Sequence, residues 1–333
     1  MKNRLNPSPC LIAVVAAVLA FGQAWLVAQA PDASAAPKRW DVARTPHGHP
    51  DLQGYWTSLS FTPFERPEKF GTREFLTDQE LDELFKAGVQ RSYELTFANP
   101  ADTPVYDATV YALDAWQNGV RPNRRTSLVV DPPDGRLPPL TPEAQARRRS
   151  ARPAPETFNG PEDLGMGVRC FTFGGPPIPA GSNYNQNTFI VQGKDHIVFE
   201  YEWGSVTRVV PLDGRPHLSA RIRPWRGDSR GRWDGDTLVI DTTNFRPGVA
   251  PQNSNAAMAR LTERFTRIDE ATIEYTYIVN DPSTWTRPWT AIIPLSKVEG
   301  PLFEYACHEG NNGLVNILEG ARAQEKQGAG RRQ

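Results

Sequence analysis

The residues Asp213–Phe245, DGRPHLSARIRPWRGDSRGRWDGDTLVIDTTNF, contain the pattern that decides the fold of this chain. An alternating run, Asp236–Thr243, follows the pair Asp234-Gly235. An Asp-Gly pair readily adopts the positive φ values that a two-residue type I′ hairpin turn requires. The stretch therefore predicts a β-hairpin that turns at Asp234-Gly235.

Two polar loops precede or enter this hairpin. They are DGRPH at 213–217 and RGDSR at 226–230. They place carboxylates, guanidinium groups and an imidazole beside the same strands, and functional groups are often found on such loops. We therefore predict a polar site next to the hairpin.

The N-terminus has the pattern of a secretory signal peptide. Lys2 and Arg4 precede an apolar, small-residue run from Leu11 to Ala28. We expect residues 1–30 to be removed and the mature chain to be periplasmic or secreted, in a bacterium. A retained membrane anchor is the alternative, because about 18 apolar residues just span a bilayer. Removal of the signal, which has two basic residues and no acid, lowers the net charge from −1 to −3.

Length and composition indicate one mainly β domain. The chain has 333 residues, with 31 prolines, 26 glycines and nine tryptophans, which is typical of many turns between aromatic-rich strands. Basic and acidic residues are interspersed, so nucleic acid is not an expected partner, and we expect no membrane partner after signal cleavage. We predict a flexible arm at 31–49, a single domain at 50–326 with a helical addition at about 77–93, and a disordered tail at 327–333.

The cysteines predict a disulfide. Cys10 lies in the signal peptide, which leaves Cys170 and Cys307 in a chain sent to an oxidising compartment. We expect these two to pair. The alternative is a nucleophilic Cys307 next to His308.

The elements predicted along the chain favour an antiparallel barrel or a strongly curved sheet with a few peripheral helices. A first strand begins near Gly54, and a capping box at 77–80 (TDQE) starts a helix. About eight antiparallel strands follow residue 187. Outside the hairpin, the predicted strands are 125–130, 188–192, 196–203, 205–212, 260–268, 272–280, 286–298 and 302–308. The further predicted helices are 141–149 and 314–326. Glu200 and Glu202 share one face of their strand, where they are either solvated or line a polar cavity.

Several longer motifs carry a resemblance. PDLQGYW at 50–56, VPLDGRPHL at 210–218, RGRWDGDTLVIDTTNF at 230–245, LTERFTRID at 261–269 and DPSTWTRPWT at 281–290 resemble motifs of a large group of secreted, mostly uncharacterised bacterial proteins. The Gly54-x-Trp56 pattern also resembles the first strand of lipocalins and other calycin barrels. The resemblance implies export and a calycin-like barrel, and it implies no reaction. CFTFGGP at 170–176 departs from the Cys-Pro-Gly stretch of the group.

The candidate site residues suit acid/base chemistry. His217, near Asp213 and Asp228, is a candidate proton-transferring group, since a neighbouring carboxylate fixes its tautomer. His308, at the end of a predicted strand, is a second candidate if the barrel rim brings the two together. For both histidines the alternative is a structural role. The predicted substrate-binding residues are Arg215 and Arg232 for an anionic group, and Trp225, Tyr277, Trp285 and Trp289 as an aromatic pocket wall, with core packing as the alternative.

Two function classes follow from this inventory. One is an exported acid/base enzyme, a lyase, isomerase or hydrolase, that acts on a small amphipathic molecule in a barrel pocket. The other is a non-catalytic, lipocalin-like small-molecule binding protein. We predict no metal, because the five histidines do not recur at metal-ligand spacing, and no nucleotide cofactor, because no glycine-rich phosphate loop is present. Convergence of the polar groups on one cavity would distinguish the two classes.

Overall fold

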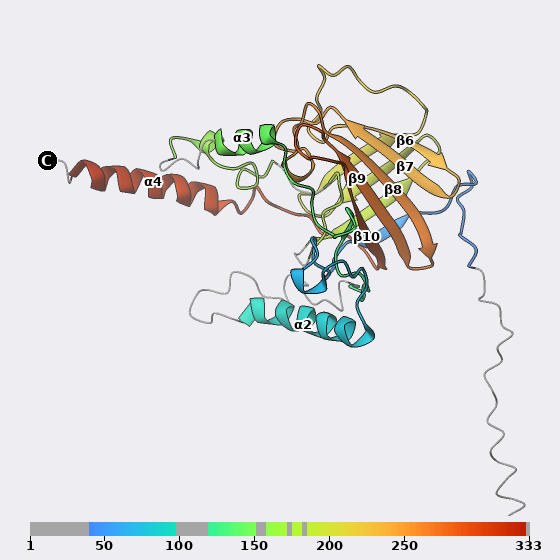
Figure 1. Ribbon diagram of the computed structural model, residues 1–333. Coiled ribbons are helices and arrows are strands. Elements are labelled where there is room, and N and C mark those ends of the chain that lie inside the picture. Colours follow the sequence, from blue (N-terminus) through green and yellow to red (C-terminus); the bar gives the residue numbers. More distant parts are fainter. Residues whose placement is uncertain (1–39, 98–118, 151–157, 172–174, 182–184, 331–333) are drawn as a thin grey trace, which may run out of the picture. The chain divides into compact units, whose positions relative to one another are not determined.

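The computed structural model describes residues 40–97, 119–150, 158–171, 175–181 and 185–330. The predicted signal peptide and residues 31–39 of the predicted arm lie outside these ranges. The described chain is mainly β, as predicted, with a ten-stranded antiparallel sheet and three α-helices (Figure 1). None of the helices in the described ranges has an apolar stretch of the length that a bilayer span needs.

The sheet has the strand order β5-β4-β3-β1-β10-β9-β8-β7-β6, and β2 pairs with β10 off this path. The N-terminal strand β1 therefore joins the meander β3-β4-β5 to the meander β6-β10. The strands are β1 Gly54–Thr57, β2 Val129–Asp131, β3 Asn187–Gln192, β4 His196–Tyr201, β5 Val206–Pro211, β6 Asp228–Asp234, β7 Thr237–Thr243, β8 Arg260–Asp269, β9 Thr272–Asn280 and β10 Trp289–Val298.

The three α-helices match the predicted positions, and the capping box predicted for the first of them forms. They are α2 Asp78–Phe97, α3 Pro142–Ser150 and α4 Asn312–Gly330, with short 3-10 turns η1 Glu68–Phe70, η2 Pro161–Asp163 and η3 Pro251–Asn253. At the start of α2, the Thr77 hydroxyl accepts from the Glu80 N–H at 3.2 Å, and the Glu80 carboxylate accepts from the Thr77 N–H at 2.8 Å. These reciprocal bonds are those of a capping box.

Two local predictions are corrected. In the hairpin, Asp234 pairs with Thr237, so the two turn residues are Gly235 and Asp236, one position later than predicted. Only Gly235 has a positive φ, of 58°, as a type II′ turn requires at its first central position. The predicted strand at 302–308 does not form; there the Tyr305 N–H donates to the Ser205 hydroxyl at 2.8 Å instead of to a sheet ladder.

The sheet is not closed by a backbone ladder, because β5 and β6 are its two edges. These edges nevertheless approach closely. A Cβ added to Gly231 of β6 would lie 2.6 Å from Leu212 Cδ2 and 3.1 Å from Val210 Cγ1. A larger residue at this position would have to displace Leu212, and side chains rather than backbone bonds connect the two edges. We call this region the seam.

A buried ion pair spans the seam from inside. Arg208 of β5 and Glu263 of β8 are 4% and 0% exposed in their side chains, with Nη2 and Oε2 2.5 Å apart. Arg208 also donates to the hydroxyls of Ser229 and Thr242, each at 2.9 Å, and Tyr275 donates to Glu263 at 2.8 Å. Burial acts to lower the pKa of Arg208, but the charge of Glu263 and the interactions with Tyr201, together with the hydrogen bonds to both residues, outweigh burial and the pKa is raised. The Arg208 guanidinium is therefore held ionised inside the sheet.

Alternating inward residues form the core around this pair. On β4, Ile197, Phe199 and Tyr201 are buried, whereas Glu200 is exposed. Glu202, directly after β4, is buried. The alternative that both glutamates are solvated is therefore wrong for Glu202. Trp56 of β1 is fully buried, and its indole N–H donates to the Leu52 carbonyl at 2.9 Å.

Two connections fix the periphery of the sheet. Cys170 and Cys307 form the predicted disulfide, with Cα atoms 5.9 Å apart. At the N-terminal side, Arg44 forms an ion pair with Asp236 at 2.8 Å, and the His49 ring stacks on Trp233 with centroids 4.7 Å apart. Arg44 and His49 of the predicted flexible arm therefore pack on the β6-β7 hairpin, because they contribute a charge and a ring that match partners there.

Candidate functional site

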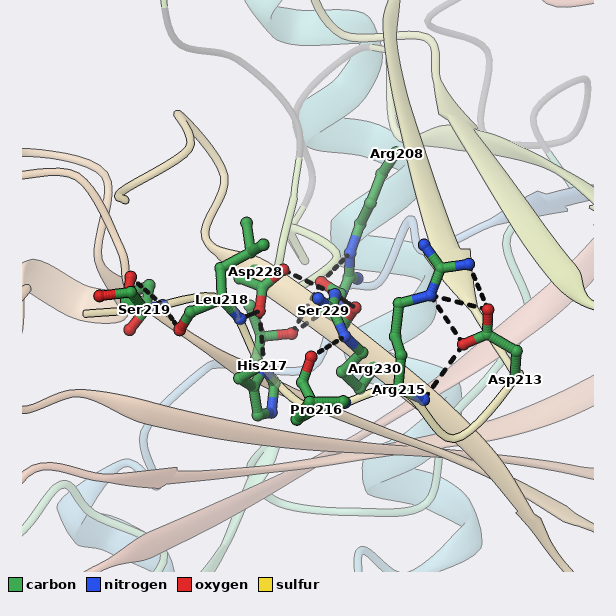
Figure 2. A network of polar contacts seen from close by, with 12 residues as sticks. Arg208, Asp213, Arg215, Pro216, His217, Leu218, Ser219, Asp228, Ser229 and Arg230 are labelled. Carbon is green, nitrogen blue, oxygen red and sulfur yellow. Dashed lines mark hydrogen bonds and ion pairs between the residues drawn. The ribbon is translucent and has the colours of Figure 1, made fainter. Parts of the chain in front are cut away.

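The candidate site lies on the loop that connects β5 to β6 and on the first residues of β6. In Figure 1 this connection is the long yellow loop that extends beyond the strand ends. Figure 2 shows that His217 points from the loop toward Asp228, the first residue of β6. His217 Nδ1 lies 2.9 Å from Asp228 Oδ2.

Three donors surround the Asp228 carboxylate, whose side chain is 5% exposed. The same oxygen that contacts His217 accepts from the Leu218 N–H at 2.9 Å, and the other oxygen accepts from Arg230 Nη1 at 2.6 Å. Arg230 Nε also donates to the Pro216 carbonyl at 3.1 Å, which ties the loop to β6. The hydrogen bonds from Arg230 and the Leu218 N–H therefore compensate the burial of the Asp228 carboxylate.

This arrangement fixes the chemistry of the His217 ring. A carboxylate accepts hydrogen bonds only, so this contact assigns the Nδ1–H tautomer to a neutral His217 ring, with the lone pair on Nε2. Within the described residues no hydrogen bond to Nε2 is present, and the His217 side chain is 32% exposed. The ring is therefore oriented by a buried carboxylate and retains one nitrogen able to accept a proton.

Asp213 does not take part in orienting His217. It binds Arg215, whose Nε lies 2.7 Å from Asp213 Oδ2, and both residues are on the surface. Hydrogen bonds from the Arg215 side chain and N–H lower the pKa of Asp213 to about 2. Of the two carboxylates proposed for this role, Asp228 contacts the ring and Asp213 is paired within its own turn.

His308 is exposed in the turn that follows Cys307, where its carbonyl accepts from the Asn311 N–H at 3.4 Å. In the described part of the chain no contact joins it to His217 or Asp228. The disulfide region does reach the loop by another route, because the Phe171 ring stacks on Trp225 with centroids 5.8 Å apart.

The predicted substrate-binding residues are distributed over three environments. Arg232 is exposed and pairs with Asp241, with Nη1 and Oδ2 2.5 Å apart. Trp225 is 42% exposed on the loop. The other three aromatic residues pack together in the core: the Trp289 ring makes edge contacts with Tyr277 at 5.6 Å and with Trp285 at 6.2 Å between centroids, and all three are nearly fully buried. Burial raises the pKa of Tyr277.

Sequence reasoning missed two residues of the network. Arg230 lies two positions after Asp228 on a strand, and side chains two positions apart share a face, so this spacing was a usable signal. Arg208 itself had no signal in the sequence, but its partner Glu263 had a weak one. Glu263 lies between Leu261 and Phe265 on the inward face of β8, where a charged residue needs a buried partner. No group of three metal-ligating side chains occurs within the described residues.

The fold and the site together define a mainly β protein with an oriented histidine on an outer loop. Comparisons with protein-family models, with curated proteins and with solved structures found no match for this chain. The resemblance to the secreted bacterial group therefore stays a prediction.

Proposed function

We propose that this protein is an exported acid/base enzyme, a lyase, isomerase or hydrolase, that acts on a small amphipathic molecule with His217 as its proton-transferring group. The observation that supports this proposal is the 2.9 Å contact between His217 Nδ1 and the buried Asp228 carboxylate. It is the arrangement that general acid/base catalysis by histidine uses.

The chemistry follows from the two ring nitrogens. As a base, His217 takes a substrate proton at Nε2, and the positive charge of the resulting imidazolium is stabilised by Asp228 at Nδ1. As an acid, it returns the proton from Nε2. Arg230 and the Leu218 N–H hold Asp228 in place through both states.

Two arginines remain proposed contacts for an anionic group of the substrate. Arg215 and Arg232 are each exposed, and each is already paired with a carboxylate. A guanidinium has five N–H donors, so a second anion is accepted without breaking the first pair. His308 as a second proton-transferring group requires substrate to reach both histidines.

A non-catalytic small-molecule binding protein is the second candidate function. The buried indole N–H groups of Trp285 and Trp289 have no hydrogen-bond partner among the described residues. Buried donors of this kind are usually paired, and an acceptor on an interior ligand would pair them.

The test begins with mass-spectrometric identification of small molecules that co-purify with the mature protein, followed by measurement of their turnover. We expect His217→Ala to reduce turnover by about 10²–10⁴-fold, the usual contribution of a general acid or base. Asp228→Asn should reduce it as well, because an amide does not impose the same tautomer. His47→Ala, a change of an exposed histidine outside the site, is the matched control.

Thermal unfolding of His217→Ala should occur within a few degrees of the wild type, because little apolar surface is lost. Turnover by His217→Ala equal to that of the control would overturn the catalytic role. A molecule that is retained but never converted would support the binding function instead.

A further inference from the structure

Two neighbouring loops expose an unusual set of apolar side chains. The first loop is 168–171, next to the disulfide, and the second is 218–225, within the β5-β6 connection. The Phe171–Trp225 stack joins them. The exposed apolar residues are Val168 at 39%, Phe171 at 48%, Leu218 at 41%, Ile222 at 52% and Trp225 at 42%. Exposed apolar side chains gathered in this way mark an interaction surface.

The same loops carry positive charge without acidic partners. The sequences 164–171, 214–227 and 244–250 contain no aspartate or glutamate. Five arginines of these three segments form no ion pair with a carboxylate of the described residues. They are Arg169, Arg221, Arg223, Arg226 and Arg246. The charge is therefore segregated locally, although the chain as a whole has a net charge of −1.

Guanidinium groups and rings alternate across this surface. Arg169 lies over the Phe171 ring at 4.8 Å, Phe171 stacks on Trp225, and Arg246 lies over the Trp225 ring at 4.0 Å. The surface is anchored to the sheet, because Asn244 Nδ2 donates to the Leu218 carbonyl at 2.9 Å and Arg226 Nη1 donates to the Gly175 carbonyl at 2.7 Å. It is thus a supported arginine–aromatic surface, defined by residues 168–171, 218–226 and Arg246.

We propose that this arginine–aromatic surface binds the headgroup region of an anionic lipid bilayer, so that the protein is peripherally attached to a membrane. Tryptophan, arginine and aliphatic side chains together are the composition that enters the interface of a bilayer. The exposed aliphatic residues Leu218, Ile222 and Val168 favour lipid over single-stranded nucleic acid, which selects aromatic stacking platforms. The inference does not depend on the proposed catalytic role of His217, and it revises the expectation that the mature chain has no membrane partner.

The test uses the full mature chain and sucrose-loaded vesicles, either of phosphatidylcholine alone or of phosphatidylcholine with phosphatidylglycerol. We expect sedimentation with the phosphatidylglycerol vesicles at low salt and release at about 1 M salt, where the Debye length is about 3 Å. A basic residue near an anionic membrane contributes roughly fivefold to binding, about 1 kcal/mol. Arg221→Ser with Arg223→Ser should therefore weaken partitioning about 25-fold.

The matched control is Arg148→Ser with Arg149→Ser, which removes the same charge from two exposed arginines of α3. This control should bind like the wild type. Ile222→Ser should weaken binding, whereas Met258→Ser, a change of another exposed apolar residue, should not.

Four results would overturn the proposal. They are the absence of binding to phosphatidylglycerol vesicles, equal binding to both vesicle types, equal loss in the two arginine double variants, and a short single-stranded oligonucleotide that binds where vesicles do not. Light scattering supplies a fifth arm: a dimer of the wild type that Ile222→Ser dissociates, without vesicle binding, would assign the surface to a second copy of the chain.

Discussion

The buried pair of Arg208 and Glu263 gives the sharpest prediction about stability. Arg208→Met removes the guanidinium and leaves the Glu263 carboxylate at 0% exposure, with Tyr275 as its remaining hydrogen-bond donor among the described residues. Removal of one partner of a buried ion pair costs about 3–5 kcal/mol, because the remaining charge is left uncompensated. We expect the free energy of unfolding to fall by that amount.

A second substitution tests the cause of this loss. In Arg208→Met with Glu263→Gln, no buried charge remains and the glutamine carbonyl still accepts from Tyr275. Since most of the cost is an unpaired charge, we expect the double variant to recover to within about 1–2 kcal/mol of the wild type. The remaining loss reflects the Ser229 and Thr242 contacts across the seam.

The assay is urea unfolding at neutral pH with the disulfide intact, with the midpoint and slope fitted separately. Arg232→Met is the matched control, because Arg232 and Asp241 have the same 2.5 Å separation but side chains that are 61% and 38% exposed. An exposed pair of this kind contributes about 0–1 kcal/mol. If Arg208→Met were no more destabilising than Arg232→Met, or if the double variant were the least stable, the buried charge would not be what joins the seam.

Three further outcomes are expected. Burial raises the pKa of the Glu202 carboxyl above its ordinary 4.5, so the folded state binds this proton more tightly than the unfolded state. The free energy of unfolding therefore falls as pH rises through the folded pKa. Glu202→Gln should raise the urea midpoint at pH 7 and have no such advantage below pH 4.5. Titration of unreduced, denatured mature protein should find no free thiol, and reduction of the Cys170–Cys307 bridge, whose separation is 137 residues, should lower the free energy of unfolding. In the chain-entropy account that loss is about 4–5 kcal/mol, and two free thiols before reduction would contradict it. Trypsin should not cut the native protein after Arg44, because that residue is held by Asp236, and rapid cleavage there would show that the arm is free.

The sequence by itself determined the features that depend on near neighbours. The alternating run after Asp234-Gly235 predicted the strand that forms as β7, Thr237–Thr243, because the side-chain period of a strand is two whatever its partners are. The capping box at Thr77 and Glu80 formed because both bonds lie within four residues. The disulfide was predicted from the expected export and from the presence of two cysteines after the predicted signal peptide, without knowledge of the fold.

Only the tertiary structure decided the features that depend on register and on distant partners. The order of the strands places β5 beside β6 at the seam. The buried ion pair there joins Arg208 and Glu263, which are 55 positions apart in the sequence. His217 had two carboxylates nearby in sequence, and the loop path selected Asp228 because Arg215 occupies Asp213. A composition that was neutral along the chain became locally positive, because folding brings residues 168–171 and 246 beside the acid-free loop that contains Trp225.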